Sequence, residues 1–499
     1  MYQAIHLLYF IAPMGLGPPT KREILLVCLL FSGLFLIFGP QGNRFVTVPA
    51  PVSPAQQYPA ALEVSEIRES YDTRLTWGAS EVSETKIIAH VPGWSIIDRL
   101  YIYKGVVFIV SDKPHEIPDV SAIYSKGVDI EVGEEAERAR LPDDSDIQII
   151  SPKEARELFG SGAQILDGVT YFVNDTPQFV RHYYHWCAEL WFGFWRTYSS
   201  LDPTISASGN TTLPPPRRML FNRLDAFRWR DYSTMNQWVV RSSFPDLTME
   251  FLDDWDDRAK MGVPFVFERV VLADRSAAMP ALNYQRYQRT AAPAFALPGS
   301  VYWWMTIRNN VVQFAGLDLG VGEGTLGPPV ITYISRQAWG RRMLVPADHE
   351  RLVRELRKLE STYGWEVNVV VPETMTRLEQ LQLAARTTIL MGVHGNGLTS
   401  LLWMTPNPRS TVMEFFYPGG FAHDYEYTTR ALGMTHYGFW DSVAFTAPDI
   451  PLPAYPEGFQ GNSIPLDGEA VAGLCIYRLT LELEEAYTKL RTLLGKVFL

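Results

Sequence analysis

Residues 388–404 read TILMGVHGNGLTSLLWM, and this stretch carries most of what the sequence says about the fold. An apolar run ends at Val393, a turn with two glycines follows, and an apolar helix begins at Leu398. The same alternation continues on both sides of it. Strands are predicted over 330–335, 365–371, 388–393 and 411–417, and helices over 349–363 and from the capping box at 376–379. This pattern predicts a parallel, Rossmann-like sheet with helices on both faces.

The turn after Val393 predicts a phosphate site. Glycine has no Cβ, so a ligand can approach the backbone closely, and a helix N-terminus offers unpaired N–H groups and a partial positive charge. From the glycines alone, a tight turn without a ligand is the simpler interpretation. The side chains of His394 and Thr399 add possible hydrogen-bond donors at the same turn, and they favour phosphate binding. We therefore expect the diphosphate to contact His394, Gly395, Asn396, Gly397, Leu398 and Thr399.

Polar residues follow the neighbouring strands of this sheet. Arg336, Arg341 and Arg342 come after the strand 330–335, in the segment SRQAWGRR. A guanidinium at that edge can hold a diphosphate bidentately and stabilise the charge that develops as it leaves. Arg336 stands directly at the strand end and is the first candidate, whereas one of the three is expected to be an ordinary surface arginine. Glu414 lies one strand further on, where a carboxylate can accept hydrogen bonds from both ribose hydroxyls or form a structural salt bridge.

The aromatic segment 181–200 predicts a helix that carries a candidate acid–base pair. His185 and Glu189 are four residues apart and share one helical face, with His182 one turn earlier. We expect the acceptor hydroxyl to lie between His185 and Glu189, and Glu189 to remove its proton. A partly exposed pair without a catalytic role is the alternative. A thiol mechanism with Cys187 is disfavoured, because residues i and i+2 point to different sides of a helix.

The first half of the chain is predicted to be a second α/β unit. Residues 106–111 and 265–272 are typical of buried strands, and the Pro-rich segment 201–216 of a loop. We place the boundary near 305, so that 63–305 forms an acceptor-side domain and 306–465 a nucleotide-sugar domain. Residues 466–499 are predicted to form a terminal helix that packs back on the domains. Two such domains facing a cleft would bind a ligand at the carboxyl ends of the strands.

The N-terminus predicts a membrane anchor. Residues 24–38 are uncharged and apolar, and Lys21 and Arg22 precede them, so the positive-inside rule keeps residues 1–23 cytoplasmic. We expect a signal anchor over 24–39 and a Pro-rich stem over 40–62. A cleaved signal peptide is the alternative. Sequons at Asn174 and Asn210 become meaningful if this part of the chain is lumenal.

The composition excludes some other classes of protein. The net charge is −11 and there is no basic stripe, so nucleic acid is not expected as a partner. Three cysteines are too few for a disulfide framework, and one bridge, Cys187–Cys475, is the most the sequence allows.

Taken together, the motifs resemble those of glycosyltransferase family 61. The strings that carry the resemblance are HYYHWCAELWFG, YISRQAWGRR, MGVHGNGLTSLLWM, TVMEFFYPGG and LGMTHYGFWD, over about residues 90–465. The resemblance implies a GT-B fold, an inverting reaction, no metal requirement, and a single-pass type II anchor in the Golgi or endoplasmic reticulum with the catalytic part lumenal. It implies that Arg336 and residues 394–399 hold UDP, that Glu414 contacts the nucleoside, and that Glu189 is the family's acidic residue. Asn396 stands where the family usually has alanine.

We therefore expect an inverting transferase that moves xylose or N-acetylglucosamine from a UDP-sugar to a protein-linked glycan, a polysaccharide or a protein hydroxyl. One alternative is a metal-dependent GT-A enzyme, because residues 144–146 and 254–256 have the D-x-D form that binds Mn²⁺ in such enzymes. A second alternative is a catalytically inactive lumenal carbohydrate-binding protein.

Overall fold

The computed structural model describes residues 82–160, 162–317 and 327–480, which belong to one compact unit. The predicted cytoplasmic tail, signal anchor and stem lie outside these residues. None of the helices in the described ranges is both long and apolar enough to cross a bilayer.

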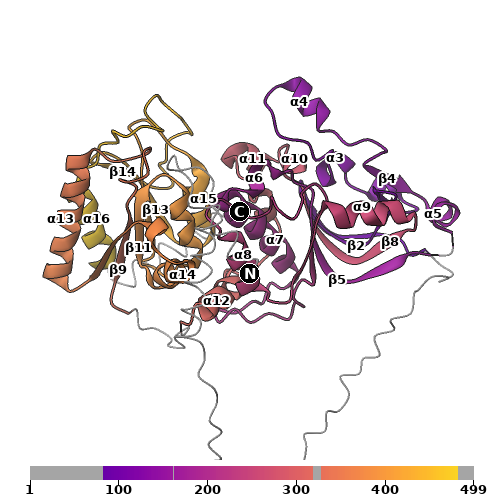
Figure 1. Cartoon of the computed structure of the whole chain (residues 1–499), viewed down its shortest axis with the longest axis horizontal. Coiled ribbons are helices and arrows are strands. Elements are labelled where there is room, and N and C mark those ends of the chain that lie inside the picture. The colour runs from indigo at the N-terminus through magenta and orange to yellow at the C-terminus, as the bar shows by residue number, and fades with distance from the viewer. Residues whose placement is uncertain (1–81, 161, 318–326, 481–499) are drawn as a thin grey trace, which may run out of the picture. The chain divides into compact units, whose positions relative to one another are not determined.

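The C-terminal sheet (orange in Figure 1) has the predicted Rossmann-like form. Its order is β10-β9-β11-β12-β13-β14, and all neighbours are parallel except the last pair. Its strands are β9 (Val330–Ile334), β10 (Glu366–Val370), β11 (Ile389–Val393), β12 (Thr411–Phe415), β13 (Thr435–Trp440) and β14 (Val443–Phe445). Because β9 has β10 on one side and β11 on the other, successive connections run in opposite directions from β9. Ligands of such sheets bind at this switch point, outside the carboxyl ends of the two central strands.

Helices cover both faces of this sheet, as the strand–helix alternation predicts. One face packs on α13 (Pro346–Tyr363) and α16 (Gly468–Thr480), which lie side by side in Figure 1. Leu352, Leu356 and Leu359 form the buried stripe of α13, and Gly364 ends that helix with a φ of 70°. The other face packs on α14 (Arg377–Arg386), η6 (Asn396–Trp403), which is a 3₁₀ helix, and α15 (His423–Ala431).

The N-terminal sheet is mixed rather than parallel throughout, in contrast to the second Rossmann-like sheet that the sequence predicts. Its order is β4-β3-β2-β8-β5-β6-β7, and β2 pairs antiparallel with β1, β3 and β8. Its strands are β1 (Lys86–Val91), β2 (Trp94–Tyr103), β3 (Val106–Val110), β4 (Ile147–Ile150), β5 (Gln164–Val173), β6 (Arg218–Phe221), β7 (Thr248–Glu250) and β8 (Phe265–Ala273). Two hairpins, which turn at Gly93 and Gly105, create the antiparallel part. Helices alternate only with the later strands.

The helices of this half are short. They are α3 (Val120–Ile123), α4 (Glu134–Ala139), α5 (Pro152–Phe159), α6 (Pro177–Val180), the π-helix η2 (His185–Trp191), α7 (Phe192–Tyr198), α8 (Asn236–Ser243), α9 (Leu252–Met261), α10 (Arg275–Ala278), α11 (Leu282–Tyr287) and α12 (Met305–Phe314). This half also has the short 3₁₀ helices η1 (Pro114–Glu116), η3 (Ser199–Leu201) and η4 (Ala292–Ala296), and η5 (Pro372–Thr374) follows β10 in the C-terminal half.

The aromatic segment 181–200 lies in the largest core cluster, which includes residues of both sheets and of α12. Trp195 Nε1 donates to the carbonyl of Trp303 (2.6 Å), and Trp304 Nε1 donates to that of Leu402 (2.8 Å). Buried indole groups usually need such partners. The core therefore ties α7 and α12 to the segment that follows the 394–397 turn.

The structure also bears on the predicted disulfide and on the two glycosylation sequons. Cys187 and Cys475 are both buried free thiols, so the one possible disulfide is not formed. Asn174 is 1% exposed, and its amide donates to the Ser125 carbonyl and to Asp274, so this sequon is part of the core. Asn210 is exposed on the 201–216 loop.

Candidate active site

The switch point brings Arg336 onto the glycine turn. Arg336 follows β9 by two residues and Gly395 follows β11 by two, and the strands are in register at Ile334 and Gly392. A Cβ on Gly395 would lie 2.7 Å from Arg336 Nη1, and a Cβ on Gly397 would lie 2.9 Å from Ile334 Cγ2. A Cβ on Gly395 would therefore displace the Arg336 guanidinium, and a Cβ on Gly397 would press on Ile334 of β9, so the two glycines leave room for the residues at the end of β9.

The turn and its arginines form a cluster of hydrogen-bond donors. The amides of Gly395, Asn396 and Gly397 donate to no acceptor within the described residues, whereas the Leu398 amide donates to the Gly395 carbonyl (3.0 Å). Leu398 is thus not available to a phosphate in this structure. The side chain of Arg336 forms no hydrogen bond or ion pair in the same ranges, and its guanidinium lies 5.7 Å from the Trp339 ring centroid.

A second guanidinium reaches the same turn. Arg342 Nη1 donates to the His394 carbonyl (3.4 Å), and its Nε donates to Gln460 (2.6 Å). Burial lowers the pKa of both Arg336 and Arg342, and the nearby guanidinium of Arg342 lowers that of Arg336 further. Neither guanidinium forms an ion pair with a carboxylate in the part of the chain that the structure describes, so both are available to an anion. Arg341, the next candidate, is exposed.

His394 and Glu414 lie in contact, but the Glu414 carboxylate faces two histidines and not the ribose that the sequence predicts for it. Glu414 is completely buried, its Oε1 lies 2.5 Å from His394 Nδ1, and its Oε2 lies 2.8 Å from His436 Nε2. Burial raises the pKa of Glu414 and lowers that of His394 to about 3 and that of His436 to about 4. Because both carboxylate oxygens are occupied, Glu414 cannot also hold a ribose here. It fixes the His394 ring at the end of β11 instead.

Asn396 and Thr399 are also engaged within the protein. Asn396 Oδ1 accepts from the Tyr184 amide (3.1 Å), and Asn396 Nδ2 donates to Ser233 Oγ (2.8 Å). Thr399 is completely buried, and its hydroxyl donates weakly to Asn396 Oδ1 (3.4 Å). The side chains of both residues therefore hold the turn against the segment that leads into η2, and only the Asn396 backbone remains for a ligand.

The predicted acid–base pair exists, at the start of η2. His185 Nδ1 lies 2.7 Å from Glu189 Oε2, and the rings of His182 and His185 are 5.0 Å apart. The intervening turn is a π-helix, a rare form that occurs often at functional sites. The side chain of His185 is 26% exposed and that of Glu189 only 2%. Only the histidine can therefore reach a ligand.

The surroundings of Glu189 correct its predicted role. Arg275 Nη1 lies 2.7 Å from Glu189 Oε2, and the Thr290 amide donates to Oε1 (3.3 Å). Burial raises the pKa of Glu189, but Arg275 and His185 outweigh it and hold this pKa well below the usual range. A carboxylate so stabilised is a poor base and has no access to an acceptor hydroxyl. An ionised Glu189 accepts a hydrogen bond from His185 Nδ1–H, which leaves His185 Nε2 to act as an acceptor.

Three residues that sequence reasoning missed complete this network: Arg275, Arg289 and Asp424. Arg275 pairs with Asp175 (3.4 Å) as well as Glu189, and Arg289 Nη1 pairs with Asp424 (2.9 Å). A signal for Arg275 was present, because Asp274-Arg275 begin two positions after the end of the predicted strand 265–272. Arg289 and Asp424 lie in segments without any pattern.

Both D-x-D segments have structural contacts. Asp146 lies near Lys126 (3.5 Å) and Arg223 (3.7 Å), and Asp254 accepts from the Phe251 amide (2.8 Å) at the start of α9. The residues that the structure describes contain no group of three or more histidine, cysteine or acidic side chains arranged to hold a metal ion.

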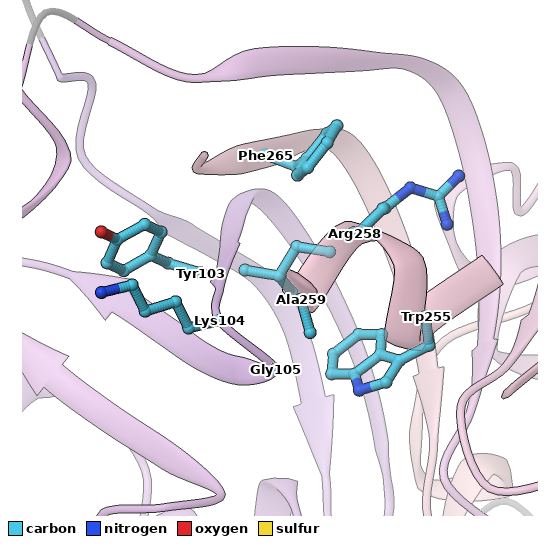
Figure 2. Close-up of a pocket in the computed structure, with 8 residues that line it drawn as sticks. Tyr103, Lys104, Gly105, Trp255, Arg258, Ala259 and Phe265 are labelled. Carbon is cyan, nitrogen blue, oxygen red and sulfur yellow. The ribbon is translucent and has the colours of Figure 1, made fainter. Parts of the chain in front are cut away.

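The hollow in Figure 2 lies away from these residues, between the β2–β3 hairpin and α9. Its empty space of about 160 Å³ includes open solvent, and it leaves no enclosed room for a ligand. Figure 2 shows Lys104 and Arg258 pointing outward from it, so no polar groups converge there.

Comparison with known proteins agrees with the sequence resemblance. Residues 183–413 match the family model described as Glycosyltransferase 61. That segment contains His185, Glu189, Arg336 and the 394–397 turn, and indicates glycosyltransferase activity in general. No curated protein matches the chain.

Proposed function

Since residues 183–413 match the family model of glycosyltransferase 61, we propose that the chain is an inverting enzyme of this family that transfers a sugar from a UDP-sugar to an acceptor hydroxyl. The donor sugar is xylose or N-acetylglucosamine, and the acceptor is a protein-linked glycan, a polysaccharide or a protein. The observation that carries the proposal is the meeting of Arg336 and Arg342 with the free amides of residues 395–397 at the switch point.

The diphosphate of the donor fits this cluster in charge and in hydrogen bonding. The diphosphate carries its negative charge on its non-bridging oxygens, and the departing UDP gains further charge on the phosphate oxygen that was bonded to the sugar. Guanidinium and amide donors that are already in place stabilise this charge without reorganisation as the bond to the sugar breaks. Nothing in this role calls for a metal ion, so we propose that none is required.

The proton of the acceptor hydroxyl goes to His185. The acceptor oxygen bonds to the anomeric carbon from the face opposite the diphosphate, and the bond between that carbon and the phosphate oxygen breaks. UDP departs with the bonding electrons, and His185 Nε2 takes the hydroxyl proton. Glu189 holds His185 in the required tautomer and stabilises the imidazolium, with Arg275 fixing the carboxylate.

The location of the protein and its membrane topology are proposed from the sequence. We propose a GT-B arrangement of the two sheets, with a type II anchor that leaves the catalytic part in the lumen of the Golgi or endoplasmic reticulum. The exposed Asn210 sequon is compatible with that side of the membrane. A fluorescent fusion and a protease-protection assay would test the topology.

Calorimetry with UDP and a panel of nucleotide sugars tests the proposed function. UDP should bind, and a hundredfold excess over Kd should stabilise the protein by about 2.7 kcal/mol. Release of UDP from UDP-xylose or UDP-N-acetylglucosamine should survive EDTA, which would exclude the metal-dependent alternative. Binding of glycans without UDP uptake would instead support the inactive carbohydrate-binding protein.

A further inference from the structure

Asp424 lies between the two halves of the proposed site. It is in the first turn of α15, and its carbonyl accepts a hydrogen bond from the hydroxyl of Tyr184 (2.9 Å), the residue before His185. The ring of the next residue, Tyr425, is 5.0 Å from the Tyr184 ring and 5.6 Å from the His394 ring. Asp424 therefore borders both the proposed base and the turn that would hold the diphosphate.

One oxygen of Asp424 is held in place and the other is open. Arg289 Nη1 lies 2.9 Å from Asp424 Oδ1 and 3.7 Å from Glu189 Oε1, so one guanidinium links the two carboxylates. Within the described ranges, Asp424 Oδ2 accepts no hydrogen bond, and the side chain is 17% exposed. Burial raises the pKa of Asp424, but Arg289 and His394 outweigh it and lower the pKa. The open oxygen thus belongs to an ionised, immobilised acceptor.

We propose that Asp424 determines donor specificity by accepting a hydrogen bond from a ring hydroxyl of the transferred sugar, and that Arg289 positions it. This inference depends on the proposed function. In that reaction the sugar must lie between His185 and the diphosphate site, which is the region that Asp424 borders. A pyranose offers hydroxyl groups as hydrogen-bond donors there. An ionised carboxylate oxygen that is held in place is a stronger acceptor for such a hydroxyl than a neutral oxygen would be. A site built to bind a hydroxyl discriminates strongly against a sugar that lacks it.

The test compares Asp424→Asn with the unaltered chain on UDP, UDP-xylose, UDP-N-acetylglucosamine and analogues of these sugars that lack a single hydroxyl. With the parent donor, kcat/KM should fall about 10- to 100-fold, because a hydrogen bond to a charged group is lost. On the one analogue that lacks the contacted hydroxyl, the variant and the unaltered chain should differ by less than about threefold. Affinity for UDP alone should change by less than twofold. Asp257→Asn, an exposed aspartate on α9, is the matched control.

The outcomes separate the two proposals. An equal loss on every analogue, or a matching loss of UDP affinity, would overturn the role of Asp424 while leaving the transferase proposal intact. Failure of the unaltered chain to bind UDP would overturn the proposed function, and the inference with it. If Asp424→Asn does not fold, Asp424→Glu keeps the ion pair and moves the oxygen by one methylene. That variant should keep its UDP affinity and change its order of preference among the analogues, and an unchanged order would overturn the inference.

Discussion

The guanidinium of Arg336 lies against the backbone of Gly395, so close that a Cβ at position 395 would sit 2.7 Å from Arg336 Nη1. The glycine is the residue that allows this arginine to reach the amides of the turn. Each depends on the other, because Gly395 leaves the space and Arg336 fills it with positive charge.

Gly395→Ala should therefore displace Arg336 and weaken UDP binding. We expect a 10- to 100-fold increase in the Kd for UDP, equivalent to about 1.4–2.8 kcal/mol, measured by calorimetry. Gly473→Ala is the control, because a Cβ there meets nothing within 4 Å and the residue lies in α16. That change should raise the free energy of unfolding by up to about 1 kcal/mol. Unaltered UDP affinity in Gly395→Ala would contradict the proposed diphosphate site.

Arg336→Ala should reduce turnover by about 10²–10³-fold, since it removes a donor that stabilises the leaving group. The measurement is UDP release at saturating donor, with thermal unfolding followed in parallel. Arg217→Ala, at an arginine whose side chain is 56% exposed and 4.0 Å from Asp167, should stay within twofold of the unaltered chain. Turnover near the normal value in Arg336→Ala would remove this residue from the mechanism.

His185 and Glu189 should differ in their effects on the reaction. His185→Ala removes the group that takes the proton, so kcat should fall about 10²–10⁴-fold with little change in the Kd for UDP. Glu189→Gln keeps the volume but removes the charge that Arg275 and Arg289 neutralise, so it should also lower the thermal midpoint. If Glu189 itself took the proton, His185→Ala would retain substantial activity.

His182 should make the protein less stable as the pH falls. Burial and the neighbouring His185 lower the pKa of His182 to about 4 from its ordinary value of 6.5. Between these values the unfolded chain binds a proton that the folded chain does not. The free energy of unfolding therefore declines on acidification from about pH 6.5 to about pH 4, by up to about 1.4 kcal/mol per pH unit.

Urea unfolding at several pH values checks this window. His182→Gln should flatten the slope between pH 6.5 and 4, whereas His115→Gln, at an exposed position, should not. Identical slopes for the two variants would show that folding does not lower the pKa of His182.

The sequence by itself determined the local elements of the C-terminal half. Apolar runs, the capping box at Thr376 and the stop at Gly364 predict β9 to β12, α13 and the start of α14 to within three residues, because these signals act over a few neighbours. Strands β13 and β14 and helix α15 were not predicted, and the helix expected from Leu398 is the 3₁₀ helix η6, which begins at Asn396. Spacing also predicted the His185–Glu189 contact, since it depends on a single helical turn. The family match then agreed with the strings that suggested a transferase.

Only the tertiary structure decided which of these groups face a ligand. Glu414 is at the predicted strand end, yet His394 and His436, from neighbouring strands, occupy its carboxylate. Glu189 is on the predicted face, yet it is buried against Arg275 and Arg289, which lie 86 and 100 residues further along the chain. Their positive charges stabilise the ionised form of its carboxyl group. Periodicity records which side of an element is apolar, but hydrogen bonds and charges between distant segments arise only when the chain packs. That packing leaves hydrogen-bonding groups of His185, Arg336 and Asp424 available to a ligand, whereas the carboxylates of Glu189 and Glu414 are buried and already paired.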